Sequence, residues 1–235
     1  MSHLDEELKM LKADIKEMWN LVINQLSSAQ ISLFDSDKET IAEVYANEKR
    51  VDDFELKINM ECENILALFN PLANDLRFVL SVLKINYNLE RVGDYAKSIA
   101  KLVKNSEKRF HNKILEEAKI PVMFEVCLEM LKDSLEAFEK ENNEIAMSIF
   151  QKDEKLDNVN RNSNKQIASF IKDNPKDVVH FLDLFLIIKR LERVGDQTKN
   201  ISEEIIFYIE AKQLRHSRLK VEKNQKKKKN KKEDS

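Results

Sequence analysis

Leu89-Glu90-Arg91-Val92-Gly93-Asp94 recurs without change as Leu191-Glu192-Arg193-Val194-Gly195-Asp196. The shift between the copies is 102 residues, from Glu90 to Glu192. Upstream, a shift of 105 residues places Glu48-Lys49-Arg50-Val51-Asp52 over Asp153-Glu154-Lys155-Leu156-Asp157. The shift of 102 also pairs other residues of the same type: Asp75 with Asp177, Leu80 with Leu182, Ile85 with Ile187 and Lys97 with Lys199. The chain is therefore a duplication, which predicts two stacked copies of one structural unit.

The only two glycines of the chain, Gly93 and Gly195, both lie inside the repeated motif. A glycine in a helix costs roughly 1 kcal/mol relative to alanine, so we expect a neighbouring helix to approach closely at each one. The Glu and Asp of each motif are four residues apart, which places both carboxylates on one helix face. In the first copy this face continues an apolar stripe of Leu76, Leu80, Leu83 and Tyr87. We therefore expect each carboxylate pair to face the centre of its own helical unit.

Composition favours an all-α protein. The 235 residues include 2 Gly and 3 Pro, too few for a fold that is rich in turns. Cys62 and Cys127 form no C-x-x-C motif, which favours a reduced compartment over a disulfide framework. The acidic, polar start of the sequence is unlike a signal peptide. No apolar run approaches the ~18 residues that a membrane span needs, so we expect a cytoplasmic protein.

Apolar periodicity predicts three long helices in each copy. Five of the expected helices cover about 4–34, 38–68, 71–104, 143–172 and 175–212, and the apolar series from Phe124 to Phe138 marks the remaining one. Asn70 and Asn174 are the expected N-caps, with Pro71 and Pro175 at first helical positions. The stretch Asp35-Ser36-Asp37 ends the first helix and can cap the second, and the fifth helix starts after Asn142. The predicted architecture is two tandem three-helix bundles. Its parts are a first unit at 1–104, a linker at 105–120 with a helical piece near 114–118, a second unit at 121–216 and a disordered Lys-rich tail at 217–235.

The tail has two interpretations from sequence alone. Lys220 to Ser235 carries eight Lys and no apolar residue after Val221, a composition that cannot form a packed core. It is either a solubilising end without a partner or a segment attracted to anionic lipid or RNA.

The motif itself has three interpretations from the residues alone. Its carboxylates form a solvated face, or the motif serves helix packing, or the carboxylates bind a hard cation or iron. The four His offer no repeated Glu-x-x-His pair of the di-iron kind, and two glycines cannot build a phosphate-cradling loop. The sequence shows no enzyme constellation.

The motif and its surroundings resemble the PhoU family, the cytoplasmic accessory regulators of phosphate-specific ABC transport. The resemblance rests on the two Glu-Arg-Val-Gly-Asp copies, on Asn70-Pro71-Leu72-Ala73-Asn74-Asp75-Leu76-Arg77, and on the stretch from Asn200 to His216. It covers nearly all of residues 4–216.

The resemblance implies two three-helix bundles, dimerisation into a homodimer, and clusters of metal ions, iron or zinc, held by carboxylates. The residues that match this metal-binding role are Glu90, Asp94, Glu192, Asp196, Asp52 and Asp157. It further implies a non-enzymatic regulator that contacts a phosphate transporter ATPase and a sensor histidine kinase and so reaches the membrane through partners. Nucleic acid is not an expected partner. The alternatives are a metal-dependent or metal-storage helical protein and a plain helical scaffold.

Overall fold

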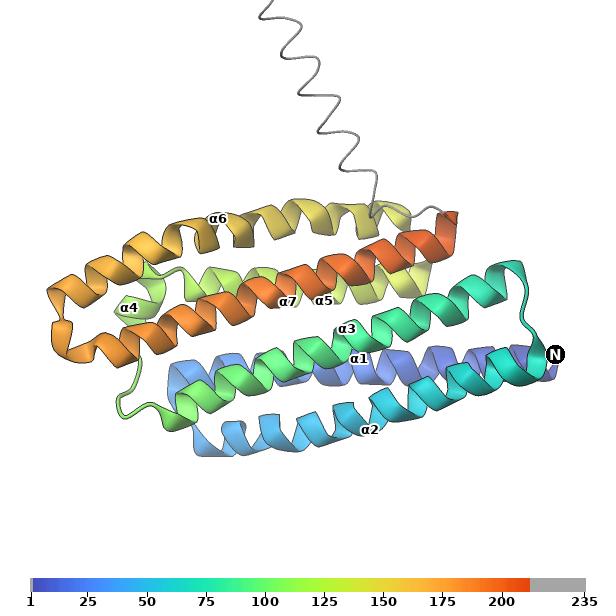
Figure 1. The fold of residues 1–235 in the computed structure, drawn as a ribbon, viewed down its shortest axis with the longest axis horizontal. Helices are drawn as coiled ribbons and strands as arrows, with labels where there is room; N and C mark the ends of the chain where they lie inside the picture. Colours follow the sequence, from blue (N-terminus) through green and yellow to red (C-terminus); the bar gives the residue numbers. More distant parts are fainter. Residues whose placement is uncertain (1, 212–235) are drawn as a thin grey trace, which may run out of the picture.

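The computed structural model describes residues 2–211, and within that range the chain is helical and contains no strand (Figure 1). The all-α prediction is confirmed. Two short elements, α4 (Asn112–Glu117) and the 3-10 turn η1 (Pro175–Asp177), connect longer helices. The long helices are α1 (His3–Asp35), α2 (Lys38–Phe69), α3 (Ala73–Asn105), α5 (Ile120–Lys140), α6 (Asn143–Asp173) and α7 (Val178–Glu210).

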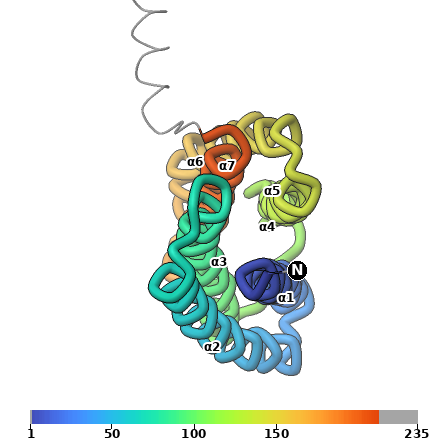
Figure 2. Tube along the Cα trace, turned by 90° about the vertical axis from the view of Figure 1, so that its right-hand side faces the viewer, coloured from blue at the N-terminus to red at the C-terminus, as the bar shows by residue number. Residues whose placement is uncertain are grey.

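The long helices form two three-helix bundles that lie side by side. Helices α1, α2 and α3 pack on one another, as do α5, α6 and α7, and α3 lies along α7 (Figure 2). Two contacts across that junction are related by the 102-residue shift: Asn200 Nδ2 donates to Asn88 Oδ1 at 3.4 Å, and Arg190 Nε donates to Ser98 Oγ at 3.1 Å. A shift of 102 residues relates Asn88 to Arg190 and Ser98 to Asn200, so each of the two contacts is the repeat equivalent of the other. The two repeats therefore meet about an approximate two-fold axis.

An aromatic cluster joins the apolar interiors of the two bundles. Trp19 of α1 and Phe78 of α3 lie 5.5 and 6.1 Å from Phe138 of α5, measured between ring centroids. Trp19 and Phe138 are fully buried and Phe78 is nearly so. Burying an aromatic side chain of this kind contributes roughly 1.5–3 kcal/mol. The bundles therefore share one continuous core.

The helix caps agree with expectation at two loops and differ at two. Asp37, in the stretch expected to cap the second helix, accepts from Glu39 N and Thr40 N. Asn142, after which the fifth helix was expected to start, accepts from Glu144 N and Ile145 N. Asn70 is instead the left-handed C-cap of α2, with φ of 47°, and α3 begins later, at Ala73. Asn174 precedes the 3-10 turn, so α7 begins at Val178 and ends at Glu210. Asn suits both an N-cap and a left-handed C-cap, and this made the first assignment wrong.

The connection between the bundles is more than a polar spacer. It contains the predicted helical piece, now α4, and it buries Phe110, Leu115 and Ala118. The Phe110 ring stacks on the imidazole of His180 in α7, with ring centroids 4.1 Å apart. The connection is thus packed against the second bundle.

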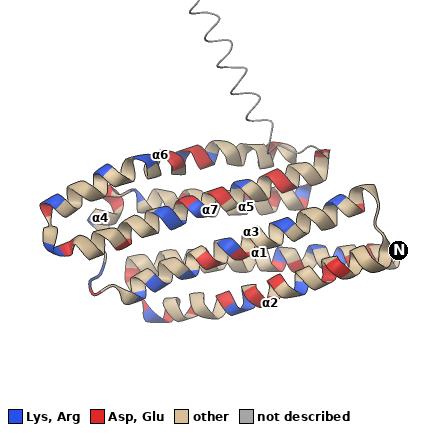
Figure 3. Cartoon of the chain, viewed as in Figure 1, with Lys and Arg blue, Asp and Glu red and all other residues tan. Residues whose placement is uncertain are grey.

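Charged residues of both signs are distributed along the long helices (Figure 3). Among residues 2–211, no helix is both long and apolar enough to cross a membrane. The predicted tail at 217–235 lies outside the described residues.

Candidate functional site

Both motif glycines lie where another helix comes close, as predicted. A Cβ on Gly93 would lie 3.2 Å from Gln25 Oε1 of α1 and 3.3 Å from both Glu48 Oε2 and Val51 Cγ1 of α2. A Cβ on Gly195 would overlap Leu156 Cδ1 of α6. Each glycine therefore lets the last helix of its bundle, α3 or α7, pack tightly on the middle helix, α2 or α6.

In the first repeat, the close approach brings a buried carboxylate to the motif helix. Glu48 is 3% exposed, and its Oε2 accepts from Gln25 Nε2 at 2.6 Å. Its Oε1 accepts from Lys97 Nζ at 3.2 Å. The same Gln25 amide also donates to the Gly93 carbonyl at 3.2 Å. Burial raises the pKa of Glu48, while Gln25 and Lys97 act in the opposite direction.

The second repeat reproduces this arrangement with a shorter side chain. Asp153 replaces Glu48 and is 4% exposed. Lys199, the repeat partner of Lys97, donates to Asp153 Oδ2 and, at 3.1 Å, to Asp196 Oδ1. One ammonium thus joins the buried acid of α6 to the motif acid of α7.

The motif carboxylates lie at the edge of each bundle rather than at its centre. Glu90, Asp94, Glu192 and Asp196 are all half-buried, and Tyr87, on the stripe expected to be apolar and inward, is 58% exposed. The buried face of α3 instead contains Leu89, Val92 and Gly93. The expectation that each pair faces the bundle centre was wrong, because the inward stripe of α3 is rotated by about one residue.

Crowding of like charges marks the motif in both repeats. Burial, followed by the nearby Asp94 carboxylate, raises the pKa of Glu90 to about 7. Burial, followed by the Asp196 carboxylate, also raises the pKa of Glu192. Each motif Asp has an arginine partner within the motif: Arg91 Nη1 lies 3.4 Å from Asp94 Oδ2, and Arg193 Nη1 lies 3.2 Å from Asp196 Oδ2.

The two further predicted acids differ in placement. Asp52 is exposed and follows the buried Val51 directly. Its negative charge acts to raise the pKa of Lys97. Asp157 is half-buried and close enough to raise the pKa of both Asp153 and Glu192. Asp157 therefore belongs to the carboxylate cluster of the second repeat, with Asp153, Glu192 and Asp196. Asp52 lies at the rim of the corresponding cluster of the first repeat.

The buried acids and their lysine partners were not predicted as site residues, although the sequence contains signals for them. Glu48 interrupts the apolar series Ile41, Val44 and Val51, and Lys97 and Lys199 are related by the repeat shift. A charged residue on a buried stripe requires a partner. Searching the facing helix for a cation conserved in both copies would have found the lysines.

The carboxylates fit a metal ion in type. Their oxygens are ligands that hard cations and iron accept, and the raised pKa of Glu90 reflects like charges that a cation would stabilise. In residues 2–211, however, no three His, Cys, Asp or Glu side chains are gathered closely enough to hold one ion. Lys97 and Lys199 supply the cations beside the buried acids. Holding a metal there requires the carboxylates to be drawn together.

Comparison with known families gives two matches along the chain. The model of the PhoU domain matches residues 15–103 and again residues 120–205. The chain belongs to the PhoU family. The two matches correspond to the two bundles, and the family consists of regulatory accessory proteins and not of enzymes, as predicted.

Individual relatives agree with this membership. A phosphate-specific transport system accessory protein PhoU homolog of Zymomonas mobilis is 32% identical over 210 residues, which are 89% of this chain and 88% of that protein. The PhoU homolog of Pseudomonas putida is 28% identical over 221 residues, covering 91% and 83%.

Two solved structures have the same fold. The crystal structure of PhoU from Pseudomonas aeruginosa superposes with a TM-score of 0.81 at 25% identity, covering 89% of this chain and all of that one. The phosphate transport system regulatory protein PhoU from Streptococcus pneumoniae gives 0.80 at 30% identity, covering 90% and 99%.

Proposed function

We propose that this chain regulates phosphate uptake and phosphate-starvation signalling by contact with a phosphate ABC transporter ATPase and a sensor histidine kinase. The observation that carries the proposal is the PhoU match in both repeats, together with relatives named as accessory proteins of phosphate-specific transport. The chain then acts in the cytoplasm, as a homodimer, and reaches the membrane through its partners.

Capture of partners tests this proposal. The full chain, tagged and expressed in its own cells at high and at low phosphate, is expected to retain the transporter ATPase and the kinase at high phosphate. Deleting the gene is expected to raise the expression of phosphate-starvation genes at high phosphate. Unchanged expression in the deletion strain, with neither partner retained, would refute the regulatory role.

We further propose that the motif carboxylates bind iron or zinc, and that the first repeat binds it more strongly. Two substitutions between the repeats support this order. Glu55, which raises the pKa of Glu90, has Asn160 as its repeat partner, and Tyr87 has Lys189. Lys189 Nζ donates to Asn160 Oδ1 at 2.6 Å and lowers the pKa of Glu192. At these two positions, the second repeat has one acid fewer and one cation more than the first.

Exchange of these two positions provides matched variants. Glu55→Asn with Tyr87→Lys gives the first repeat the charges of the second, and Asn160→Glu with Lys189→Tyr does the reverse. Metal content and binding isotherms for iron and zinc are expected to fall in the first variant and rise in the second. Metal bound equally by both variants and by wild type would contradict the order. Absence of metal from wild-type protein purified from its own cytoplasm and from protein reloaded with either ion would return the motif to helix packing.

A further inference from the structure

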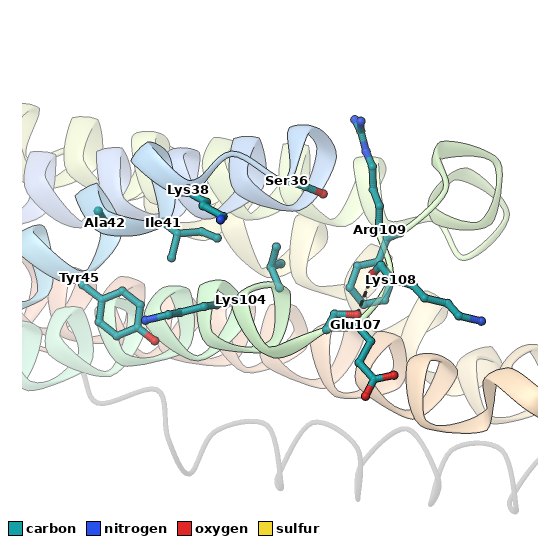
Figure 4. A pocket seen from close by; sticks show the side chains of 12 residues that line it. Ser36, Lys38, Ile41, Ala42, Tyr45, Lys104, Glu107, Lys108 and Arg109 are labelled. Atoms are coloured by element: carbon teal, nitrogen blue, oxygen red, sulfur yellow. Dashed lines mark hydrogen bonds between the residues drawn. The ribbon is translucent and has the colours of Figure 1, made fainter.

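A pocket of about 760 Å³ lies at one end of the first bundle, away from both motifs (Figure 4). Its walls come from the start of α2, the end of α3 and the connection that follows α3. The lining residues are Ser36, Lys38, Ile41, Ala42, Tyr45, Val103, Lys104, Ser106, Glu107, Lys108, Arg109 and Phe110. A volume of this size is in the range of small-molecule sites, which span roughly 300–1,000 Å³.

The floor of the pocket is apolar and aromatic. Ile41, Val103 and Phe110 are buried, and Tyr45 is half-buried at one side. Lys104 Nζ lies 5.3 Å from the centre of the Tyr45 ring, and Figure 4 shows the two side chains next to each other. Such a floor suits a flat ring that lies beside Tyr45.

The charged rim is basic, with four cationic residues and one acid, Glu107. Two of the cations are engaged elsewhere. Arg109 Nη2 donates to the Phe34 carbonyl at 2.5 Å, and Lys108 forms an ion pair with Asp177. Lys38 and Lys104 are the exposed ammonium groups on the two facing walls, one from α2 and one from α3. Ser36 and Ser106 add hydroxyl groups at the same end of the bundle.

We propose that this pocket binds an organic phosphate that carries an aromatic ring, of the nucleotide class. The ring lies on the apolar floor beside Tyr45, and the phosphoryl group lies between Lys38 and Lys104. Two ammonium groups match the double negative charge of a phosphate monoester better than the single charge of a carboxylate. The lining offers few polar groups in the floor, so the site distinguishes a phosphorylated ring from a bare ring but has little preference among bases. This inference is independent of the metal proposal, since no motif residue lines the pocket.

Calorimetric titration of the full chain with adenosine 5′-monophosphate, adenosine and inorganic phosphate tests the site. The nucleotide is expected to bind, and each of the two fragments to bind at least about tenfold more weakly. Lys38→Gln with Lys104→Gln is expected to weaken nucleotide binding at least about tenfold. The matched control, Lys132→Gln with Lys172→Gln, alters two exposed lysines outside the pocket and is expected to leave binding unchanged.

A second pair of variants tests the cavity itself. Ala42 and Ala46 are both exposed on α2, one turn apart, and only Ala42 lines the pocket. Ala42→Phe is expected to abolish nucleotide binding and Ala46→Phe to preserve it, with circular dichroism melting curves confirming that both variants fold. The proposal is overturned if the nucleotide does not bind wild type at about 1 mM, if inorganic phosphate binds equally well, or if the Ala42 and Ala46 variants behave alike.

Discussion

Glu61 is a carboxylic acid outside the motifs whose ionisation the fold opposes. Its side chain is 24% exposed, and its Oε2 atom is buried and without a hydrogen bond among the described residues. Burial, followed by the Asp14 carboxylate of α1, raises the pKa of Glu61 from 4.5 to about 7. Lys57 acts in the opposite direction, but its ammonium lies closer to Asp14, at 2.6 Å, than to Glu61, at 3.7 Å.

The raised pKa has a definite sign for stability. Because the folded state holds this proton more tightly than the unfolded state, the favourable contribution of neutral Glu61 is present below pH 4.5 and is lost as the pH rises to about 7. The full difference corresponds to roughly 3 kcal/mol. Since a quarter of the side chain remains in water, we expect about 2 kcal/mol.

Glu61→Gln removes this ionisation while preserving the shape of the side chain. The variant is expected to be about 2 kcal/mol more stable than wild type at pH 8, or roughly 4–8 °C in Tm, and to match wild type at pH 4.5. Urea unfolding at the two pH values measures the difference, and Glu63→Gln, an exposed position on the same helix, is the control. If the difference in unfolding free energy between Glu61→Gln and wild type is the same at pH 4.5 and at pH 8, the carboxyl group is solvated and this prediction is refuted.

Three further predictions concern the motif helices and the tail. Gly195→Ala gains about 1 kcal/mol of helix propensity but meets buried Leu156, so it is expected to lose about 1–2 kcal/mol in urea unfolding; a more stable variant would contradict the close approach. Lys199→Met leaves Asp153 buried without its cation and is expected to cost about 3–5 kcal/mol at pH 7, with Asp153→Asn in the same chain restoring most of it; no rescue would separate the two residues. Removing Lys220 to Ser235 is expected to leave Tm unchanged, and a fall of several degrees would show that the tail is docked.

The fold was predictable because the features that specify it lie within short stretches of the sequence. Apolar periodicity defined each long helix, and the internal repeat defined the two bundles. The two glycines predicted close approach because a helix tolerates glycine only at a cost. Caps such as Asn70 and Asn174 were less predictable, because the same residue type serves at either end of a helix.

The site was only partly predictable, because its central pairs join different helices. Sequence spacing placed Glu90 and Asp94 on one face of a helix, but the rotation of that helix within the bundle decides whether the face points inward. The pairing of Glu48 with Lys97 likewise depends on how α2 lies against α3. The spacing of apolar residues in a single helix determines neither the rotation of that helix within the bundle nor its register with a neighbouring helix.

Comparison of the two repeats distinguishes the buried positions that both copies share from the rim positions at which their charges differ. The glycine, the buried acid of the preceding helix and the lysine beside it are present in both copies, and the acid lies close to both the glycine and the lysine. Adding a side chain at the glycine crowds the neighbouring helix, and removing the lysine leaves a buried carboxylate without its cation. Glu55 and Tyr87 lie further from the bundle centre, where water screens a change of charge. There the second copy has Asn160 and Lys189. This difference in charge at the rim, around a centre that both copies share, is the basis on which we propose that the two repeats bind the same cation with different affinities.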